Sequence, residues 1–153
     1  MVIKKMPPIE KIHEAYSAIV DGRVNLQDGI AKVLSSDRKK EYTVTWEENV
    51  YSSNDNATYW QGYAGYPIIA VLLLTGKLPF NQVVAESFKG INWTELNAKN
   101  KANYAKSVAI IMEDLKQKGI DCGVINEDIQ VVYEKMKLLD IKCKRSTIRL
   151  SSF

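Results

Sequence analysis

The sequence contains little of the chemistry that most catalytic and metal sites require. Its 153 residues include one histidine and two cysteines. The cysteines, Cys122 and Cys143, show no CxxC pattern and no paired ligand spacing, which argues against a disulfide framework or a zinc site. Two reduced thiols that pack as small hydrophobic groups are the simpler interpretation.

The single histidine narrows the possible chemistry further. Any His-dependent triad or multi-histidine metal site within one chain has to include His13. Glu10 precedes it by three residues, but carboxylate-bridged metal sites with that spacing need further Glu and His pairs on partner helices. Since His13 also lies on the apolar face of a predicted helix, we interpret it as a core residue. We predict no catalytic residue, metal or cofactor.

Phosphate-binding and membrane-spanning patterns are also missing. Gly62-Tyr63-Ala64-Gly65 has neither the GxGxxG spacing nor the lysine of a P-loop. Residues 56–76 carry no charge, but their polar first half leaves only about ten continuous apolar residues, the length of a buried helix. Residues 1–8 contain no apolar run typical of a secretion signal. We expect a cytoplasmic protein without a membrane span.

Composition indicates an ordinary globular protein. Hydrophobic residues make up 46% and charged residues 25% of the chain, and the net charge is +3. This mildly basic balance, with a pI near 8.7, is below that of a dedicated nucleic-acid binder. No repeat, low-complexity tract or linker divides the chain, so we predict a single domain over residues 1–153.

Aromatic residues are abundant in one segment. Seven of the eleven Tyr and Trp residues fall between Tyr42 and Tyr66, directly before the apolar run 68–74. Large rings with a polar edge form either the middle of a core or a ligand platform, and the pattern alone does not separate these two. If the rings are exposed, the predicted binding patch consists of Trp46, Tyr51, Tyr59, Trp60 and Tyr63.

Periodicity predicts mostly helices. Apolar spacing indicates helices over 9–20, 26–34, 92–118 and 126–139, and a short helix that ends at Gly90. In the first helix, Lys11 and Glu14 are expected on the polar face. An apolar helix ends at Gly76 and begins either at Thr58, with a kink, or at Pro67.

Two segments alternate with the period of a strand. Residues 41–53 read as a hairpin, and residues 142–150 read as a closing strand. The expected fold class is α+β, mostly α, with about six helices around a central apolar helix and a small antiparallel sheet. That sheet would contain the hairpin 41–53 and the C-terminal strand.

Carboxylates lie among the aromatic residues. Glu47, Glu48 and Asp55 beside tryptophan and tyrosine could suit sugar binding, or a glycosidase pair with two carboxyls at a set separation. We favour a structural interpretation, in which the two glutamates keep the hairpin turn soluble and Asp55 shapes a loop.

Basic residues form two clusters that could meet on one edge of the sheet. They are Arg38, Lys39 and Lys40 before the hairpin, and Lys142, Lys144, Arg145 and Arg149 in the terminal strand. The order of elements over 9–53 also matches a winged helix-turn-helix. However, the would-be recognition helix has no array of Arg, Asn or Gln for base edges, and Glu47 and Glu48 would repel phosphates. Lysines on edge strands also discourage sheet aggregation.

Three functions therefore remain open. The favoured hypothesis is a non-enzymatic protein-interaction or structural domain, in contact with another protein or with a second copy of itself. The first alternative is a nucleic-acid-binding domain that uses the basic clusters and stacks single strands on exposed rings. The second alternative is a small-ligand-binding protein or enzyme whose pocket lies in segment 42–66. It requires convergent polar groups around Glu47 or Asp55.

Overall fold

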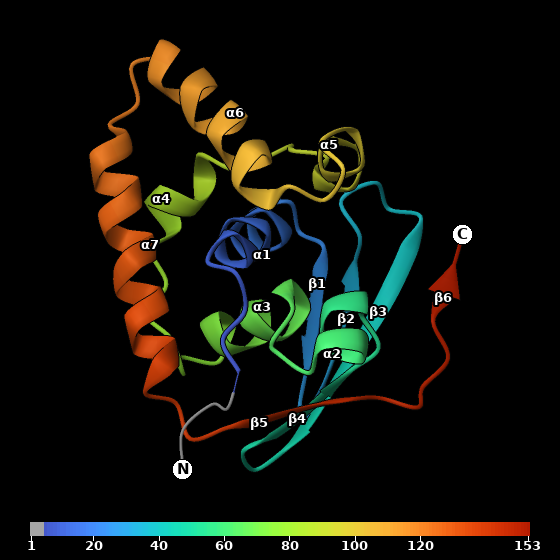
Figure 1. Cartoon of the computed structure of the whole chain (residues 1–153). Coiled ribbons are helices and arrows are strands. Elements are labelled where there is room, and N and C mark those ends of the chain that lie inside the picture. Colours follow the sequence, from blue (N-terminus) through green and yellow to red (C-terminus); the bar gives the residue numbers. More distant parts are fainter. Residues whose placement is uncertain (1–4) are drawn as a thin grey trace.

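The computed structural model describes residues 5–153 and has an α+β architecture (Figure 1). Residues 1–4, which belong to the segment 1–8 considered above for a secretion signal, lie outside the described residues. The described helices are α1 (Glu10–Val20), α2 (Asn56–Gln61), α3 (Tyr66–Leu74), α4 (Gln82–Glu86), α5 (Trp93–Lys99), α6 (Tyr104–Gln117) and α7 (Cys122–Lys137). The strands are β1 (Val24–Gln27), β2 (Ile30–Leu34), β3 (Lys40–Glu47), β4 (Val50–Ser53), β5 (Lys142–Arg145) and β6 (Ser151–Ser152).

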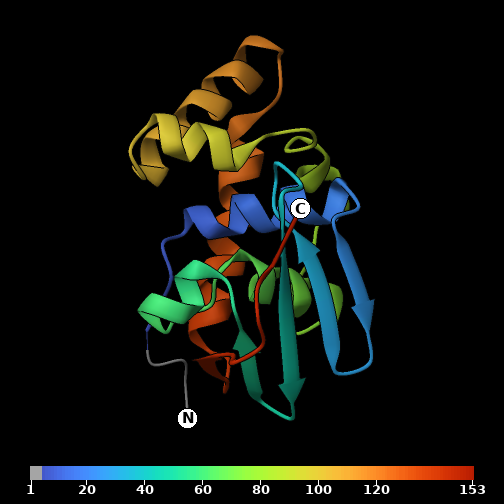
Figure 2. The ribbon, with the colours of Figure 1, turned by 90° about the vertical axis from the view of Figure 1, so that its right-hand side faces the viewer.

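The sheet is wider than the sequence predicted, and it is mixed. Strands β1 to β5 lie in chain order, and β6 pairs with the start of β3 (Figure 2). The hairpin 41–53 is confirmed as β3 and β4. The expected strand 142–150 is wrong in two respects. It forms two short strands, β5 and β6, and β5 pairs with β4 in parallel. Parallel pairing is possible here because the helices α2 to α7 connect β4 to β5 and return the chain to the same end of the sheet.

The predicted helix 26–34 is wrong, because this segment forms the β1–β2 hairpin. Gln27 pairs with Ile30, so Asp28 and Gly29 form a two-residue turn. Gly29 has φ 76°, a left-handed conformation that glycine adopts at little steric cost. Asp-Gly between two runs is a strong hairpin signal. Ala31 and Val33 are buried, as alternation requires, and the apolar positions of this short segment also fit a helical period.

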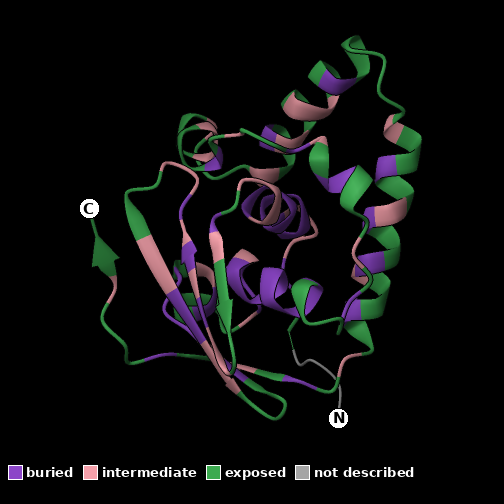
Figure 3. Cartoon of the chain, turned by 180° about the vertical axis from the view of Figure 1, so that it is seen from behind, coloured by how far each residue is buried: buried purple, intermediate pink, exposed green. Residues whose placement is uncertain are grey.

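The apolar run after Pro67 forms the middle of the core, as predicted. Helix α3 begins at Tyr66 with Pro67 in its first turn, and residues 68–73 are buried, whereas Leu74 is exposed. Helix α1 packs on α3, and α3 packs against β3 and β4. Figure 3 shows that burial concentrates in α1, α3 and the facing side of the sheet, whereas α6 and α7 are exposed on their outer sides.

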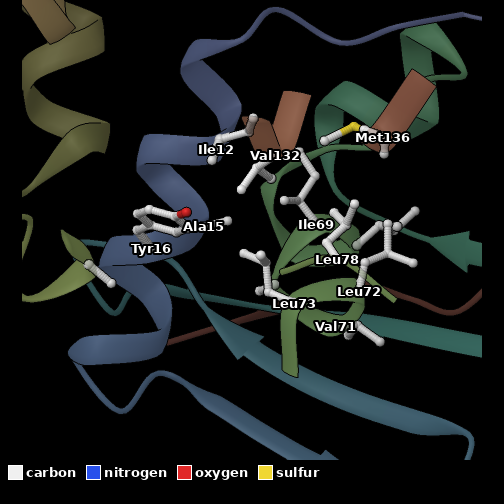
Figure 4. Close-up of a cluster of buried hydrophobic side chains, with 14 of the residues drawn as sticks. Ile12, Ala15, Tyr16, Ile69, Val71, Leu72, Leu73, Leu78, Val132 and Met136 are labelled. Atoms are coloured by element: carbon white, nitrogen blue, oxygen red, sulfur yellow. The ribbon is translucent and has the colours of Figure 1, made fainter. Parts of the chain in front are cut away.

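The core joins segments that are far apart in the chain. In Figure 4, side chains of α1 and α3 meet side chains of α7. The labelled members include Ile12 and Tyr16 of α1, Leu72 of α3, and Val132 and Met136 of α7, all essentially without solvent exposure. Each such aliphatic side chain contributes about 1.5–3 kcal/mol on burial.

Two of the predicted long helices are each divided. Residues 58–76 form α2 and α3, separated by 62–65, so the alternative in which the apolar helix starts near Pro67 is confirmed. The predicted helix 92–118 breaks between α5 and α6, where Lys101 and Ala102 have φ values of 55° and 61°. Asn103 then caps α6 by accepting from the Lys106 N–H.

The other helices differ from their expected bounds only at the ends. Asn92 caps α5 by accepting from the Glu95 N–H, and α4 lies within the short helix predicted before Gly90. Helix α7 begins four residues earlier than expected, because Asp121 caps it through the N–H groups of Gly123 and Val124. Within residues 5–153, no helix has the length and apolar character needed to cross a membrane.

Candidate ligand-binding cleft

A cleft of about 280 Å³ with charged and aromatic side chains in its wall opens beside α1. Its wall comes from α1, the start of β3, the N-terminal ends of α2 and α3, and α5 with the start of α6. Figure 1 shows α1 between α5 and α6 on one side and α2 and α3 on the other. The cleft is unusual because four of its ionisable side chains, those of Lys11, Glu14, Arg23 and Asp55, are buried.

Lys11 and Glu14 form a buried ion pair on one turn of α1. Their Nζ and Oε2 atoms lie 3.5 Å apart, and each side chain is only 8% exposed. Lys11 Nζ also lies 3.9 Å from the centre of the Tyr104 ring, in a cation–π contact. Burial lowers the pKa of Lys11, but Glu14, Tyr104 and Tyr63 together outweigh this effect, and this pKa ends above its usual value. Burial raises the pKa of Glu14, and Lys11 only partly offsets it.

Arg23 follows α1 and is 3% exposed. Its Nη1 donates a 2.7 Å hydrogen bond to the carbonyl of Leu34, at the end of β2. Its Nε lies 3.5 Å from Asp21 Oδ2, which is too long for a hydrogen bond. Its Nη2 has no partner among the described residues. A buried guanidinium with unused N–H donors destabilises the fold, because those donors lose their hydrogen bonds to water and gain none in the protein.

Asp55 links the end of β4 to the start of α2 in the cleft wall. It caps α2 by accepting from the Thr58 N–H at 3.1 Å, and the Ser53 hydroxyl donates to its other oxygen. Burial raises its pKa, and the hydrogen bonds from Ser53 and Thr58 oppose this shift. The expectation that Asp55 shapes a loop agrees with this geometry. Its carboxylate also forms part of the cleft wall.

Two tyrosines line the cleft and pack against each other. The rings of Tyr42 and Tyr66 meet edge to face, with centroids 6.2 Å apart. Burial raises the pKa of Tyr42 to about 12, and burial also raises the pKa of Tyr66. Both phenols therefore stay protonated at neutral pH and can donate hydrogen bonds. Nearby, Asn97 Oδ1 is a buried acceptor without a partner in the described part of the chain.

The sequence missed most of these residues. Lys11 and Glu14 were expected on the polar face of the first helix, but both are buried, with Lys11 against the ring of Tyr104 at the start of α6. Arg23 had no motif that would mark it. The available signals were the i, i+3 Lys–Glu spacing and the rarity of arginine, four residues in the chain, and neither is specific.

The predicted aromatic patch is divided by the structure. Tyr51 is 1% exposed and stacks on Trp46, which is half-buried, so this pair belongs to the packed side of the sheet. Tyr59 and Trp60 on α2 are exposed, with Trp60 at 72%, and their ring centroids are 4.8 Å apart. Tyr63 is half-buried, with Lys5 Nζ 5.5 Å from its ring centre.

The predicted basic patch is also divided. Lys142 pairs with Val50 at one end of the sheet, whereas Lys40 pairs with Ser152 at the opposite end of β3. Lys39 and Lys40 are exposed there, and β6 brings Arg149 toward that end. Two further contacts involve the remaining arginines. Arg38 donates to the carbonyl of Asp21, and the Arg145 guanidinium lies 5.2 Å from the Tyr59 ring centre. Lys144 lies on β5, two residues after Lys142.

The winged-helix interpretation does not hold. Its recognition helix would occupy residues 26–36, and residues 26–34 of this segment form most of the β1–β2 hairpin. Glu47 and Glu48 are exposed at the β3–β4 turn, as expected, and they line a separate shallow surface pocket with Lys144.

His13 is a buried residue, as interpreted. Its ring packs edge to face on Phe88, with centroids 5.3 Å apart. Burial lowers its pKa to about 4. Among residues 5–153 there is no group of three His, Cys, Asp or Glu side chains that could hold a metal ion. Cys122 and Cys143 are free thiols, and burial raises the pKa of Cys143 to about 12.

The chain was compared with known protein families, curated proteins and solved structures. No curated protein and no solved structure matches the chain. A family model matches residues 4–142, a range that includes every residue lining the cleft and ends at the first residue of β5. Because that match covers most of the chain, the protein belongs to the family described as uncharacterised conserved protein UCP014422.

Proposed function

We propose that this protein binds a small polar molecule in the cleft beside α1. The observation that supports this proposal is the burial of Lys11, Glu14, Arg23 and Asp55 around a cavity of about 280 Å³. The small-ligand alternative for segment 42–66 requires convergent polar groups around Glu47 or Asp55, and the wall of this cleft has such groups near Asp55. The sequence had favoured protein contact instead.

Fold stability alone does not explain this wall. Replacing a buried ion pair by well-packed apolar residues is often neutral or stabilising, so the Lys11–Glu14 pair is not needed to hold α1 in place. Arg23 keeps an unpaired donor and Asn97 an unpaired acceptor, and each unpaired group costs about 1–3 kcal/mol. A ligand that pairs with these groups recovers that free energy on binding.

The size of the cleft limits the ligand. Pockets for drug-sized molecules span about 300–1,000 Å³, so this cleft suits a molecule of a few to roughly a dozen heavy atoms. Aromatic side chains of Trp93, Tyr66 and Tyr104 supply flat apolar surface beside the charged groups. That combination is typical of sites for small polar metabolites.

A blocked cleft tests the proposal. Ala98 is exposed and lines the cleft, so Ala98→Phe should narrow it without disturbing the core. Ala109→Phe is the control, because Ala109 is exposed on α6 and does not line the cleft. We expect at least one compound in a panel of small carboxylates, phosphate esters, polyols and amines to raise the melting temperature of the wild type and the control, but not of Ala98→Phe. If no compound distinguishes the variants, the proposal is wrong.

The second candidate function is protein contact through Trp60. This side chain is 72% exposed, and exposed tryptophans are frequent anchors of interfaces. Tyr59 and Arg145 extend the same surface. Sedimentation of the wild type and of Trp60→Ala over a range of concentrations tests the self-association form of this candidate. A wild-type dimer that Trp60→Ala dissociates supports it, and a monomer at all concentrations excludes it.

A further inference from the structure

We infer that the molecule bound in the cleft carries an oxyanion, a carboxylate or a phosphate, and that this group docks on Arg23. The inference rests on the proposed function of this cleft, and it specifies the chemical class of the ligand. It starts from the unused hydrogen-bonding groups on the wall.

Arg23 is the main recognition group. Its side chain is buried, with only 3% of the residue exposed, and it lines the cleft. Its Nη2 lacks a partner among residues 5–153. Its Nη1 is committed to the Leu34 carbonyl, which fixes the plane of the guanidinium. A buried guanidinium with free N–H groups is best satisfied by an ionised oxygen acceptor, because charge-assisted hydrogen bonds are roughly twice as strong as neutral ones.

The neighbouring groups add further donors. Tyr66 and Tyr42 also line the cleft, and their rings meet edge to face. Both phenols stay protonated at neutral pH, because burial raises their pKa values. The wall therefore combines the Arg23 guanidinium with two phenols that can donate hydrogen bonds. An oxyanion has several lone pairs and can accept from all three.

The carboxylates of the site do not cancel this preference, because each already interacts with a cation or a donor of the protein. Glu14 is paired with Lys11. Asp55 accepts from Ser53 and Thr58. Asp21 accepts from the Gly90 N–H through Oδ1, and its Oδ2 faces Arg23 Nε at 3.5 Å, which leaves the Nη2 side of the guanidinium for a ligand.

The test uses three small probes on the intact protein. Acetate and inorganic phosphate carry the two forms of the anion, and acetamide is the neutral analogue of acetate. Binding is followed in NMR spectra by the Arg23 Nε–H and the Trp93 indole N–H, since Trp93 also lines the cleft. We expect saturable shifts with at least one anion and much weaker shifts with acetamide. Stronger binding of acetate assigns a carboxylate ligand, and stronger binding of phosphate assigns a phosphate ligand.

Variants link the binding to the named groups. Arg23→Lys keeps the charge but loses the planar donors, and we expect roughly tenfold or greater weakening of anion binding. Tyr66→Phe removes one hydroxyl and should weaken binding by about threefold to tenfold, in a protein that stays folded even if Arg23→Lys does not. Lys39→Gln is the control, because Lys39 is an exposed cation outside the cleft, and it should bind as the wild type does.

Two results would overturn the inference, and they have different consequences. If acetamide binds as tightly as both anions, the ligand is not an anion, and the proposed small-molecule site remains. If the anions bind with equal affinity to the wild type, Arg23→Lys and Tyr66→Phe, these residues do not recognise them. The compound panel with Ala98→Phe does not depend on either result. It therefore shows separately whether the cleft binds any small molecule.

Discussion

Gly65 lies directly against the carboxylate of Asp55: a Cβ atom added at Gly65 would lie 2.0 Å from Asp55 Oδ2. The Gly65 N–H also donates to the Thr58 hydroxyl, so one short segment joins the start of α3 to the capped start of α2. This contact positions both the Asp55 carboxylate and Tyr66 at the cleft.

The first prediction follows from this contact. Gly65→Ala should lower the free energy of unfolding by about 3 kcal/mol, because the new methyl group displaces the carboxylate that caps α2. Gly62→Ala is the control: Gly62 has φ 75° but open space around it, so only backbone strain of about 1 kcal/mol is expected. Urea denaturation measures both. Equal losses would show that the Asp55 contact is not restrictive.

The second prediction concerns pH and His13. Its pKa is about 4 in the folded protein and 6.5 in the unfolded chain, so between these values only the unfolded chain takes up the proton. Stability is therefore fully present above pH 6.5 and falls as the pH drops toward 4, by about 3 kcal/mol in total.

The wild type alone does not isolate this effect. Glu14 and Asp55 have raised pKa values, so they bind protons more readily in the folded state. Their contribution to stability therefore falls as the pH rises above their unfolded pKa values, which is opposite in sign to the contribution of His13. The comparison is therefore between the wild type and His13→Gln, by denaturation from pH 4 to 7. A difference that does not change with pH contradicts the buried, neutral histidine.

The third prediction concerns the ion pair of Lys11 and Glu14. Glu14→Gln leaves the buried Lys11 charge without its partner and should cost about 3–5 kcal/mol. The double variant Lys11→Met, Glu14→Leu removes both charges, so it should be much less destabilised than the sum of the two single variants. A double-mutant cycle by thermal or urea unfolding measures the coupling, and additive losses argue against a desolvated pair.

The fourth prediction separates two tryptophans. Trp93 is 2% exposed and its Nε1 donates to Ser17 Oγ at 2.7 Å, so Trp93→Ala should cost about 3–5 kcal/mol. Trp60 is 72% exposed, and Trp60→Ala should change stability by no more than about 0.5 kcal/mol. Unfolding experiments on the two variants test this contrast. A large loss for Trp60→Ala would show that α2 depends on that ring.

The sequence by itself determined the elements whose signals are local. The helix over 9–20 and the hairpin 41–53 each have a clear period, and the apolar helix after Pro67 is a continuous apolar run that ends at a glycine. Residues 26–34 were harder, because in so short a segment the same apolar positions fit two periods. The Asp28-Gly29 turn was the better guide.

Only the tertiary structure decided the break between α5 and α6, the parallel pairing of β5, and the cleft. The break depends on left-handed conformations at Lys101 and Ala102, residues that carry no sequence signal for them. The cleft combines groups from Lys11 to Tyr104, and periodicity describes only neighbours along the chain. Burial of a charged side chain depends on what covers it, and Lys11 packs against the ring of Tyr104 in α6, about ninety residues away in the chain.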